Sequence, residues 1–265
     1  MDSLYLNVFS CMILLLVCYV AIPLRSNGSK AFFFFILIAV LFYGFTSFLS
    51  IKDGWDEGVA AALRLSIFST LSWFALICLG YKVAAKLGVF VLPYLTILSL
   101  GVLACDFLDA HKYNDVAFPS GWITGHILTS LSTYATVSLA AMAALSVVIC
   151  QFLIKSKRPN KIMNYLPAIT EADRLQTTLL LISLVILIVG VSTGMAVEYT
   201  NSGSLFVFDH KTILTICTLI LILFLLVSNR LFGFRGKIMS RFILLAYFLI
   251  SLGYLGVKVI SQYFV

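Results

Sequence analysis

The sequence GWITGHILTSLSTYATVSLAAMAAL, from Gly121 to Leu145, is apolar or hydroxylated apart from one histidine near its start, His126. Hydroxylated residues follow this histidine at spacings of three, four, seven and eight, namely Thr129, Ser130, Thr133 and Tyr134. Residues at these spacings share one face of an α-helix. Because an imidazole above a hydroxylated stripe is poorly suited to lipid, the pattern predicts a helix whose polar face looks into a helix bundle.

The composition of the whole chain indicates an all-α integral membrane protein. The chain has 265 residues, of which 62% are hydrophobic and 11% are charged, whereas soluble domains contain about 25% charged residues. Long unbroken apolar runs favour helices over the alternating strands of a membrane barrel. In this setting the formal charge of +7 indicates basic cytoplasmic loops near anionic lipid headgroups, and we expect no nucleic-acid partner.

Eight apolar segments of roughly 20 residues each are long enough to span a bilayer. No linker is long enough to separate domains, so we expect one polytopic membrane domain, 1–265, in which 1–117 supplies four less specific helices. A capping pattern at Thr170 and Asp173 predicts a short interfacial helix before the sixth segment. The segments lie at 4–24, 31–51, 62–81, 86–107, 122–154, 176–197, 208–228 and 240–262.

The basic residues predict the orientation of this bundle. Most of the 18 lysines and arginines fall in the loops after segments one, three, five and seven. By the positive-inside rule these loops are cytoplasmic, so both termini are predicted to be extracytoplasmic. All three histidines, His111, His126 and His210, then lie on the extracytoplasmic side together with most of the acidic residues. Any binding chemistry is therefore expected at that face.

His126 and His210 are the candidate metal ligands. Each is predicted at the extracytoplasmic start of a different helix, and two neutral imidazoles on facing helices suit axial ligation of a haem iron or part of a transition-metal site. The alternative is that each is an interfacial histidine bonded to a hydroxyl or carbonyl group. A zinc site is less favoured, because no third or fourth ligand has convincing spacing.

Charged and aromatic residues near the same helix ends are further candidates. Asp209 suits the N-cap or first turn of the seventh segment. Arg64 and Lys258 either pair with Glu198 or reach toward water, and Lys211 reaches toward water. Alternatively, Arg64, Lys211 and Lys258 pair with the carboxylates of an amphipathic ligand such as haem. Trp122 is available for aromatic stacking. No Walker loop, G-x-S-x-G, H-E-x-x-H or dinucleotide pattern occurs, so no catalytic residue is assigned.

Several motifs of the second half resemble one family. The run Pro119-Ser-Gly-Trp-Ile-Thr-Gly-His126 is followed, in order, by Phe208-Asp-His-Lys211 and Phe234-Arg-Gly-Lys237. These motifs resemble those of cytochrome c assembly proteins of the CcsA and CcmC kind, and most of all the short HemX-like branch that includes the inner-membrane YpjD proteins. The resemblance covers about residues 118–265, and the first four segments match in hydropathy only.

The resemblance implies an eight-helix bundle of a bacterial-type inner (cytoplasmic) membrane that handles haem at the outer face, with other cytochrome c maturation components. His126 occupies the family's histidine position. Phe208 and Asp209 stand where the family's tryptophan-rich motif ends in tryptophan and aspartate, and His210 replaces a proline. The expected haem contacts are His126, His210, Asp209, Trp122, Arg64, Lys211 and Lys258.

Two other functions stay open beside this non-enzymatic haem-binding assembly factor. An accessory or transport subunit for ion or solute movement would use the same polar cluster as a vestibule, without bound haem. A polar pathway to the cytoplasmic side would favour transport, yet the inner halves of the segments contain almost no ionisable residue. The other alternative is a structural partner that binds no ligand.

Overall fold

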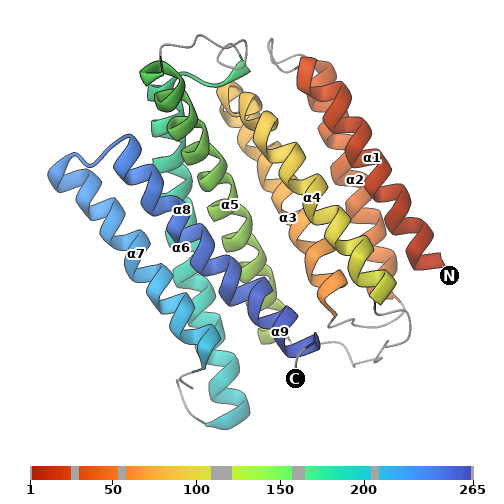
Figure 1. Ribbon diagram of the computed structural model, residues 1–265. Coiled ribbons are helices and arrows are strands. Elements are labelled where there is room, and N and C mark those ends of the chain that lie inside the picture. The colour runs from red at the N-terminus through yellow and green to blue at the C-terminus, as the bar shows by residue number, and fades with distance from the viewer. Residues whose placement is uncertain are drawn as a thin grey trace. The chain divides into compact units, whose positions relative to one another are not determined.

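The structure, a computed structural model, describes residues 2–24, 30–52, 58–108, 121–156, 165–203 and 209–263 (Figure 1). Contacts between its helices divide the chain into two compact units, Met1–Phe118 and Pro119–Val265, and each is described by itself. Every regular element within the described ranges is a helix. This is the all-α architecture that the composition predicts.

Seven helices in the described ranges are long and apolar enough to cross a membrane. The N-terminal helix α1 (Asp2–Leu24) adds a shorter apolar stretch, Leu4–Val20, so each of the eight expected segments forms a helix. A helix satisfies its backbone hydrogen bonds internally, which is why unbroken apolar runs adopt it within a bilayer. The chain is a multi-span membrane protein.

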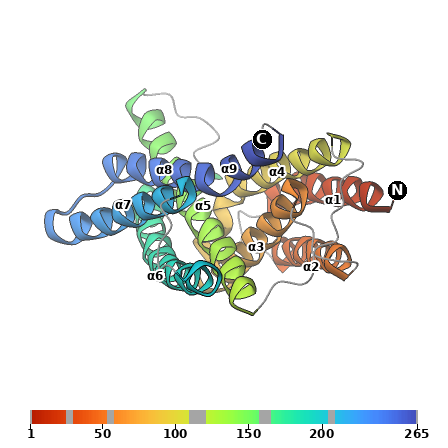
Figure 2. The ribbon, with the colours of Figure 1, turned by 90° about the horizontal axis from the view of Figure 1, so that it is seen from below.

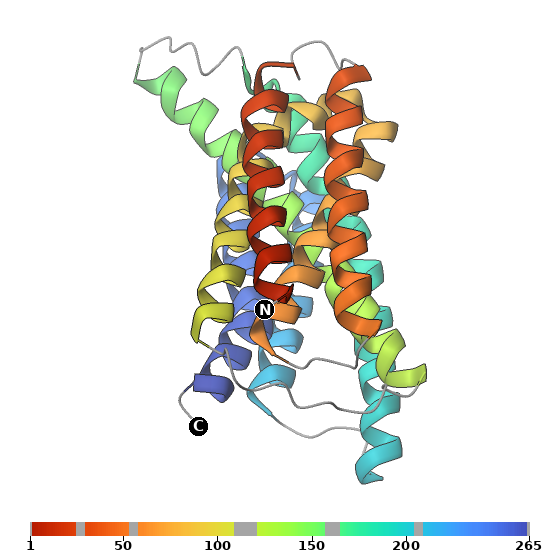
Figure 3. The same cartoon turned by 90° about the vertical axis from the view of Figure 1, so that its right-hand side faces the viewer.

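The first unit is a ring of four helices. They are α1, α2 (Lys30–Lys52), α3 (Val59–Gly80) and α4 (Gly88–Leu108), with the short 3₁₀-helix η2 (Lys82–Leu87) before α4. Helix α1 packs against α2 and α4, and α3 packs against the same two helices; Figure 3 shows α1 and α2 side by side. Inside the ring, the buried Tyr43 hydroxyl donates to the Ser99 hydroxyl at 2.8 Å, which joins α2 to α4.

The second unit has the same ring connectivity. Its helices are α5 (Gly121–Lys155), α6 (Ile169–Ser202), α7 (His210–Phe232) and an interrupted last helix made of α8 (Lys237–Ser251), the π-helical turn η4 (Leu252–Gly256) and α9 (Val257–Tyr263). Helix α5 packs against α6 and α8, and α7 packs against the same two (Figure 2). Consecutive helices run antiparallel (Figure 1). The start of α5, the end of α6 and the start of α7 therefore share one end of this unit, which we call the histidine end.

Helices α5 and α6 are longer than a bilayer requires. They contain 35 and 34 residues, which at 1.5 Å per residue gives lengths of about 50 Å. The hydrocarbon core of a bilayer is about 30 Å thick. Each helix therefore tilts or extends beyond the hydrocarbon, as the length of the segment 122–154 predicts for α5.

The prediction of a separate interfacial helix before the sixth segment is wrong, because α6 runs without a break from Ile169. The predicted capping pair is wrong as well. The backbone N–H of Ala168 donates to the Glu171 carboxylate at 3.3 Å, so the observed pair lies two residues before the expected Thr170 and Asp173. The reason is that Asp173 makes its hydrogen bonds with another part of the unit.

The last predicted segment, 240–262, is not a regular helix. Leu252–Gly256 form a π-helical turn between α8 and α9. A Cβ added at Gly253 would lie 3.3 Å from the Cβ of Leu214 on α7, so the absence of a side chain lets α7 approach the turn closely. Such π-helical turns are frequent at functional sites, and this one lines a cavity described below.

Candidate functional site

His126 lies on the second turn of α5, in a notch on α6. Its ring Nδ1 is 3.0 Å from the carbonyl oxygen of Gly190, and a Cβ added at Gly194 would lie only 2.9 Å from its Cε1. Gly190 and Gly194 are four residues apart, so both open the same face of α6. Because neither glycine has a side chain, the imidazole packs directly against the α6 backbone.

The hydrogen bond to Gly190 fixes the proton arrangement of the His126 ring. A carbonyl oxygen only accepts hydrogen bonds, so Nδ1 is the donor and the neutral ring has its lone pair on Nε2. Thr193 supports this arrangement, because its hydroxyl lies 3.4 Å from Nδ1 and donates to the same carbonyl at 2.9 Å. A ring held in this way has the tautomer and orientation of a metal-ligating histidine.

The hydroxylated stripe below His126 faces into the second unit, as its spacing predicts. Thr133 and Tyr134 are each 1% exposed. The Tyr134 ring lies 6.4 Å and 5.6 Å from the ring centroids of Tyr247 and Tyr254 on the last helix. The stripe therefore continues into an aromatic cluster inside the ring of helices.

Two adjoining cavities open beside the His126 ring. The larger, which we call the rim cavity, has a volume of about 360 Å³ and lies where α6 ends and α7 begins. The smaller, the inner cavity, has a volume of about 170 Å³ and reaches Tyr134 and Tyr254. His126 and Lys211 line both cavities. The polar residues of the rim cavity are His126, Glu198, Asp209, Lys211, Thr212 and Thr215.

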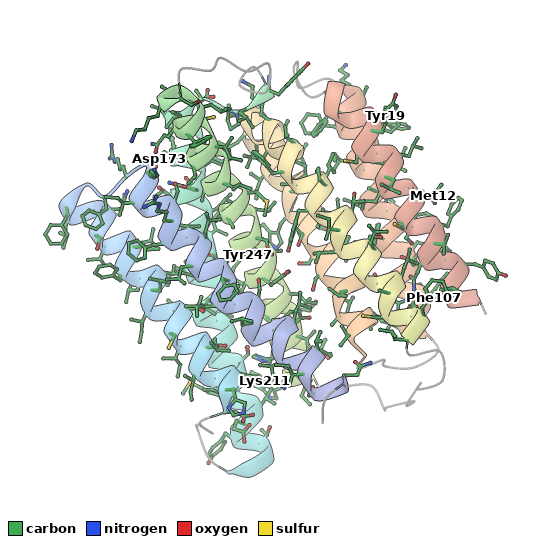
Figure 4. The ribbon with its side chains drawn as sticks, in the orientation of Figure 1. Met12, Tyr19, Phe107, Asp173, Lys211 and Tyr247 are labelled. Atoms are coloured by element: carbon green, nitrogen blue, oxygen red, sulfur yellow. The ribbon has the colours of Figure 1, made fainter. Side chains whose placement is uncertain are left out.

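Lys211 is the cation of this site and lies at the start of α7 (Figure 4). Within the described residues its ammonium group forms no ion pair. Asp209 is the N-cap residue, and its backbone carbonyl accepts the Ile213 N–H at 2.9 Å. Its carboxylate makes no capping hydrogen bond, which differs from the expected N-cap role. Asp209 is among the residues that line the rim cavity.

The site combines a preoriented imidazole, an ammonium group without an ion-pair partner among the described residues, and an apolar wall formed by Val191, Met195 and Ile216. A ligand with a metal ion, an apolar surface and a carboxylate would match all three features. In the part of the chain that the structure describes, no group of three or more His, Cys, Asp or Glu side chains is arranged to bind a metal ion.

Comparison with known proteins gives the family. The model of the family described as "Cytochrome C assembly protein" matches residues 4–265. The chain belongs to the cytochrome c assembly protein family. It is also 32% identical, over 242 residues, to an uncharacterized 28.8 kDa protein in a nifR3-like 5' region of Azospirillum brasilense, with 89% of this chain and 88% of that protein covered. The family match thus includes the N-terminal helices, beyond the residues 118–265 that carried the resemblance.

Three predicted contacts of this cytochrome c assembly family member are not among the residues that line the two cavities. His210, the first residue of α7, is exposed and is not among the residues that line either cavity. Trp122, one turn before His126, is also exposed. Lys258 is half-buried on α9. Their contacts with a ligand stay predictions.

Arg64 lies in the first unit, on α3. It is buried, and its Nη1 donates to the hydroxyl of Ser50 on α2 at 2.6 Å. The predicted contact of Arg64 with a ligand stays a prediction. His111 lies outside the described residues.

Sequence reasoning missed two parts of the site. The π-helical turn brings Gly253 and Tyr254 into the lining of the inner cavity, and no periodicity in an apolar run signals such a turn. Thr215 lines both cavities. Because it follows Lys211 at a spacing of four, it shares a face of α7 with that lysine, and this signal was present in the sequence.

Proposed function

We propose that this protein binds haem at its histidine end during cytochrome c assembly, with His126 as an axial ligand of the iron. The observation that carries the proposal is the hydrogen bond from Nδ1 to the Gly190 carbonyl, which leaves Nε2 as the acceptor in a ring that lines both cavities. Histidines that ligate metals usually donate their other ring N–H to such a partner. Membership of the family provides the biological setting.

The residues around the cavities fit haem better than a bare metal ion. A bare ion would need a cluster of ligating side chains, and the described residues contain none. When bound, haem supplies an iron with most of its ligands already in place, on an apolar ring with propionate carboxylates. The apolar wall of Val191, Met195 and Ile216 suits the ring.

We assign Lys211 to a haem propionate, because its ammonium group lines both cavities and has no ion-pair partner within the described residues. Charge-assisted hydrogen bonds to carboxylates are among the stronger polar contacts in proteins. Asp209 would orient the site from the N-cap of α7, and His210 beside it is the proposed second axial ligand. The remaining proposed contacts are Trp122, Lys258 and Arg64.

We infer that the histidine end faces the extracytoplasmic side of a bacterial-type inner membrane, because most basic residues fall in the loops of the opposite side. The protein would act there as a haem-binding factor with other maturation components, and not as an enzyme. The finer assignment to the short HemX-like branch rests on the motifs Pro119–His126 and Phe208–Lys211.

The visible absorption spectrum of protein purified from haem-replete membranes tests this function. We expect a Soret band, with sharp α and β bands after reduction, that is weakened in His126→Ala and in His210→Ala. A Soret band that is unchanged in both variants would contradict the assignment of these two ligands, but it would still support haem binding. No band, even after addition of haemin, would contradict haem binding and favour an accessory or transport subunit.

A further inference from the structure

A third cavity lies at the end of the second unit opposite the histidine end. Its volume is about 470 Å³, and its lining comes from the first turns of α6, the last turn of α7 and the α7–α8 connection. Figure 4 shows Asp173 beside this connection and Lys211 at the other end of the unit. We call it the arginine cavity, and its lining residues are Thr170, Asp173, Arg174, Thr177, Thr178, Asn229 and Arg235.

The connection between α7 and α8 is held in one conformation by hydrogen bonds. Gly236 has a φ of 67°, which glycine adopts without strain. Its backbone N–H donates to Oδ1 of Asp173 on α6 at 2.9 Å. Asn229 closes the turn, because its Nδ2 donates to the Phe234 carbonyl at 2.6 Å. These bonds hold the backbone on both sides of Arg235, which lines the cavity.

The two arginines of this cavity have no anionic partner in the described part of the protein. Neither the Arg174 nor the Arg235 guanidinium forms an ion pair or hydrogen bond there. The carboxylate of the lining, Asp173, already accepts hydrogen bonds from Gly236 and from Gln176, the latter at 2.7 Å. Two guanidinium groups at one cavity are suited to a phosphate group, which they recognise with paired N–H donors.

Exposed apolar side chains flank the same connection. Leu231, Phe232 and Ile238 are 71%, 74% and 56% exposed. In a membrane protein, apolar residues beside a helix end contact lipid chains, and basic cavities between helices bind anionic headgroups. The combination favours an amphipathic ligand over a soluble phosphate.

We propose that the arginine cavity binds the phosphate-bearing headgroup of an anionic membrane phospholipid through Arg174 and Arg235. A headgroup held by both would connect the start of α6 to the α7–α8 connection, parallel to the hydrogen bond from Gly236 to Asp173. The lipid chains would lie along Leu231 and Phe232 of α7. This site is independent of His126, so neither proposal depends on the other.

Native mass spectrometry of the full chain in detergent tests the proposal, with phosphatidylglycerol and phosphatidylcholine as probes. We expect the double variant Arg174→Gln, Arg235→Gln to bind phosphatidylglycerol about tenfold more weakly. Its binding of phosphatidylcholine should be unchanged. The matched control is Arg230→Gln with Arg241→Gln, which removes the same charge from exposed residues that do not line the cavity. The control should retain most of the binding.

Three results would overturn the proposal. If both double variants lost phosphatidylglycerol binding equally, the lipid would be attracted by the general positive charge of this end of the protein and not by the cavity. Equal binding of the two lipids by the unchanged protein would mean that the headgroup charge is not recognised. Displacement of phosphatidylglycerol by inorganic phosphate or glycerol phosphate at the same concentration would mean that the ligand is a soluble phosphate.

Discussion

Because Gly194 has no side chain, the His126 ring can occupy the space beside it. A substitution that fills this space tests whether the position of the ring matters for binding. In Gly194→Ala the new Cβ would lie 2.9 Å from Cε1 of His126, closer than two carbon atoms pack. The ring must then move away from the Gly190 carbonyl. Loss of such an orienting bond weakens metal binding about 10- to 100-fold, and we expect a loss of this size in a haemin titration of the purified protein.

Gly190→Ala is the matched control for that variant. Its Cβ would meet the Thr129 hydroxyl at 3.5 Å, an ordinary contact, and its carbonyl would still accept from His126. Haem affinity should stay close to that of the unchanged protein. If both alanine variants lost affinity equally, the cause would be the packing of α5 on α6 and not the position of the ring.

Lys211 tests whether the site recognises a carboxylate. Lys211→Gln removes the ammonium group that lines both cavities, and loss of a charged hydrogen bond costs about 1.5–3 kcal/mol. We expect about tenfold weaker haem binding or more, and Lys211→Arg should retain most of it. With the dimethyl ester of haem, which has no free carboxylate, the unchanged protein and Lys211→Gln should bind alike. A difference that persisted with the ester would exclude a propionate contact.

Single residues of the site differ in how well the sequence predicts them. His126, Asp209 and Lys211 can be predicted to lie at one end because each is near the start of a helix, and all three line the rim cavity. Helix position does not determine whether a side chain points inward, so the exposure of His210 was not predictable. The Gly190 carbonyl was not predictable either, because a backbone acceptor leaves no residue signature.

At the scale of elements, hydropathy predicts where helices form and much less about their ends. All eight apolar segments are helices, because the bilayer requires internal backbone hydrogen bonding. The unbroken α6 and the π-helical turn Leu252–Gly256 were missed. Each makes a contact with a distant part of the chain, Asp173 with Gly236 and Gly253 with Leu214, which a single segment does not contain.

The hydrogen bond from Gly236 to Asp173 should stabilise the packing of α6 against the α7–α8 connection. Asp173→Ala removes an acceptor that also serves Gln176, and we expect a loss of about 1.5–3 kcal/mol. Asp173→Asn keeps an acceptor oxygen in the same position and should lose less. Thermal unfolding of the protein in detergent measures the difference. Equal stability of Asp173→Ala and the unchanged protein would contradict this role.

At the scale of the whole molecule, the sequence predicts the membrane class and not the grouping of helices. Hydropathy reports how apolar a helix is, but not which neighbour it contacts. The packing of four helices into a ring within each unit therefore emerges only from the structure. Within the second unit, the ring of helices explains why His126 and Lys211 line the same cavity although they are far apart in the sequence.

The orientation of the whole chain follows from its basic loops and has a direct test. A phosphatase that is active only outside the cytoplasm, fused after Val265, should be active, and a fluorescent protein that folds only in the cytoplasm should be dark there. Fusions after Ser156, in a predicted basic cytoplasmic loop, should give the reverse. Fluorescence from the fusion after Val265 would contradict the extracytoplasmic position of the histidine end.

The central claim is that Nε2 of His126 binds haem iron, and imidazole rescue of His126→Gly tests it most directly. Replacing the ring by glycine leaves a space of its shape beside Gly194, which free imidazole fits. We predict that His126→Gly, loaded with haemin, loses the sharp reduced α and β bands, and that added imidazole restores them. A spectrum of His126→Gly that matches the unchanged protein before any imidazole is added would contradict the claim.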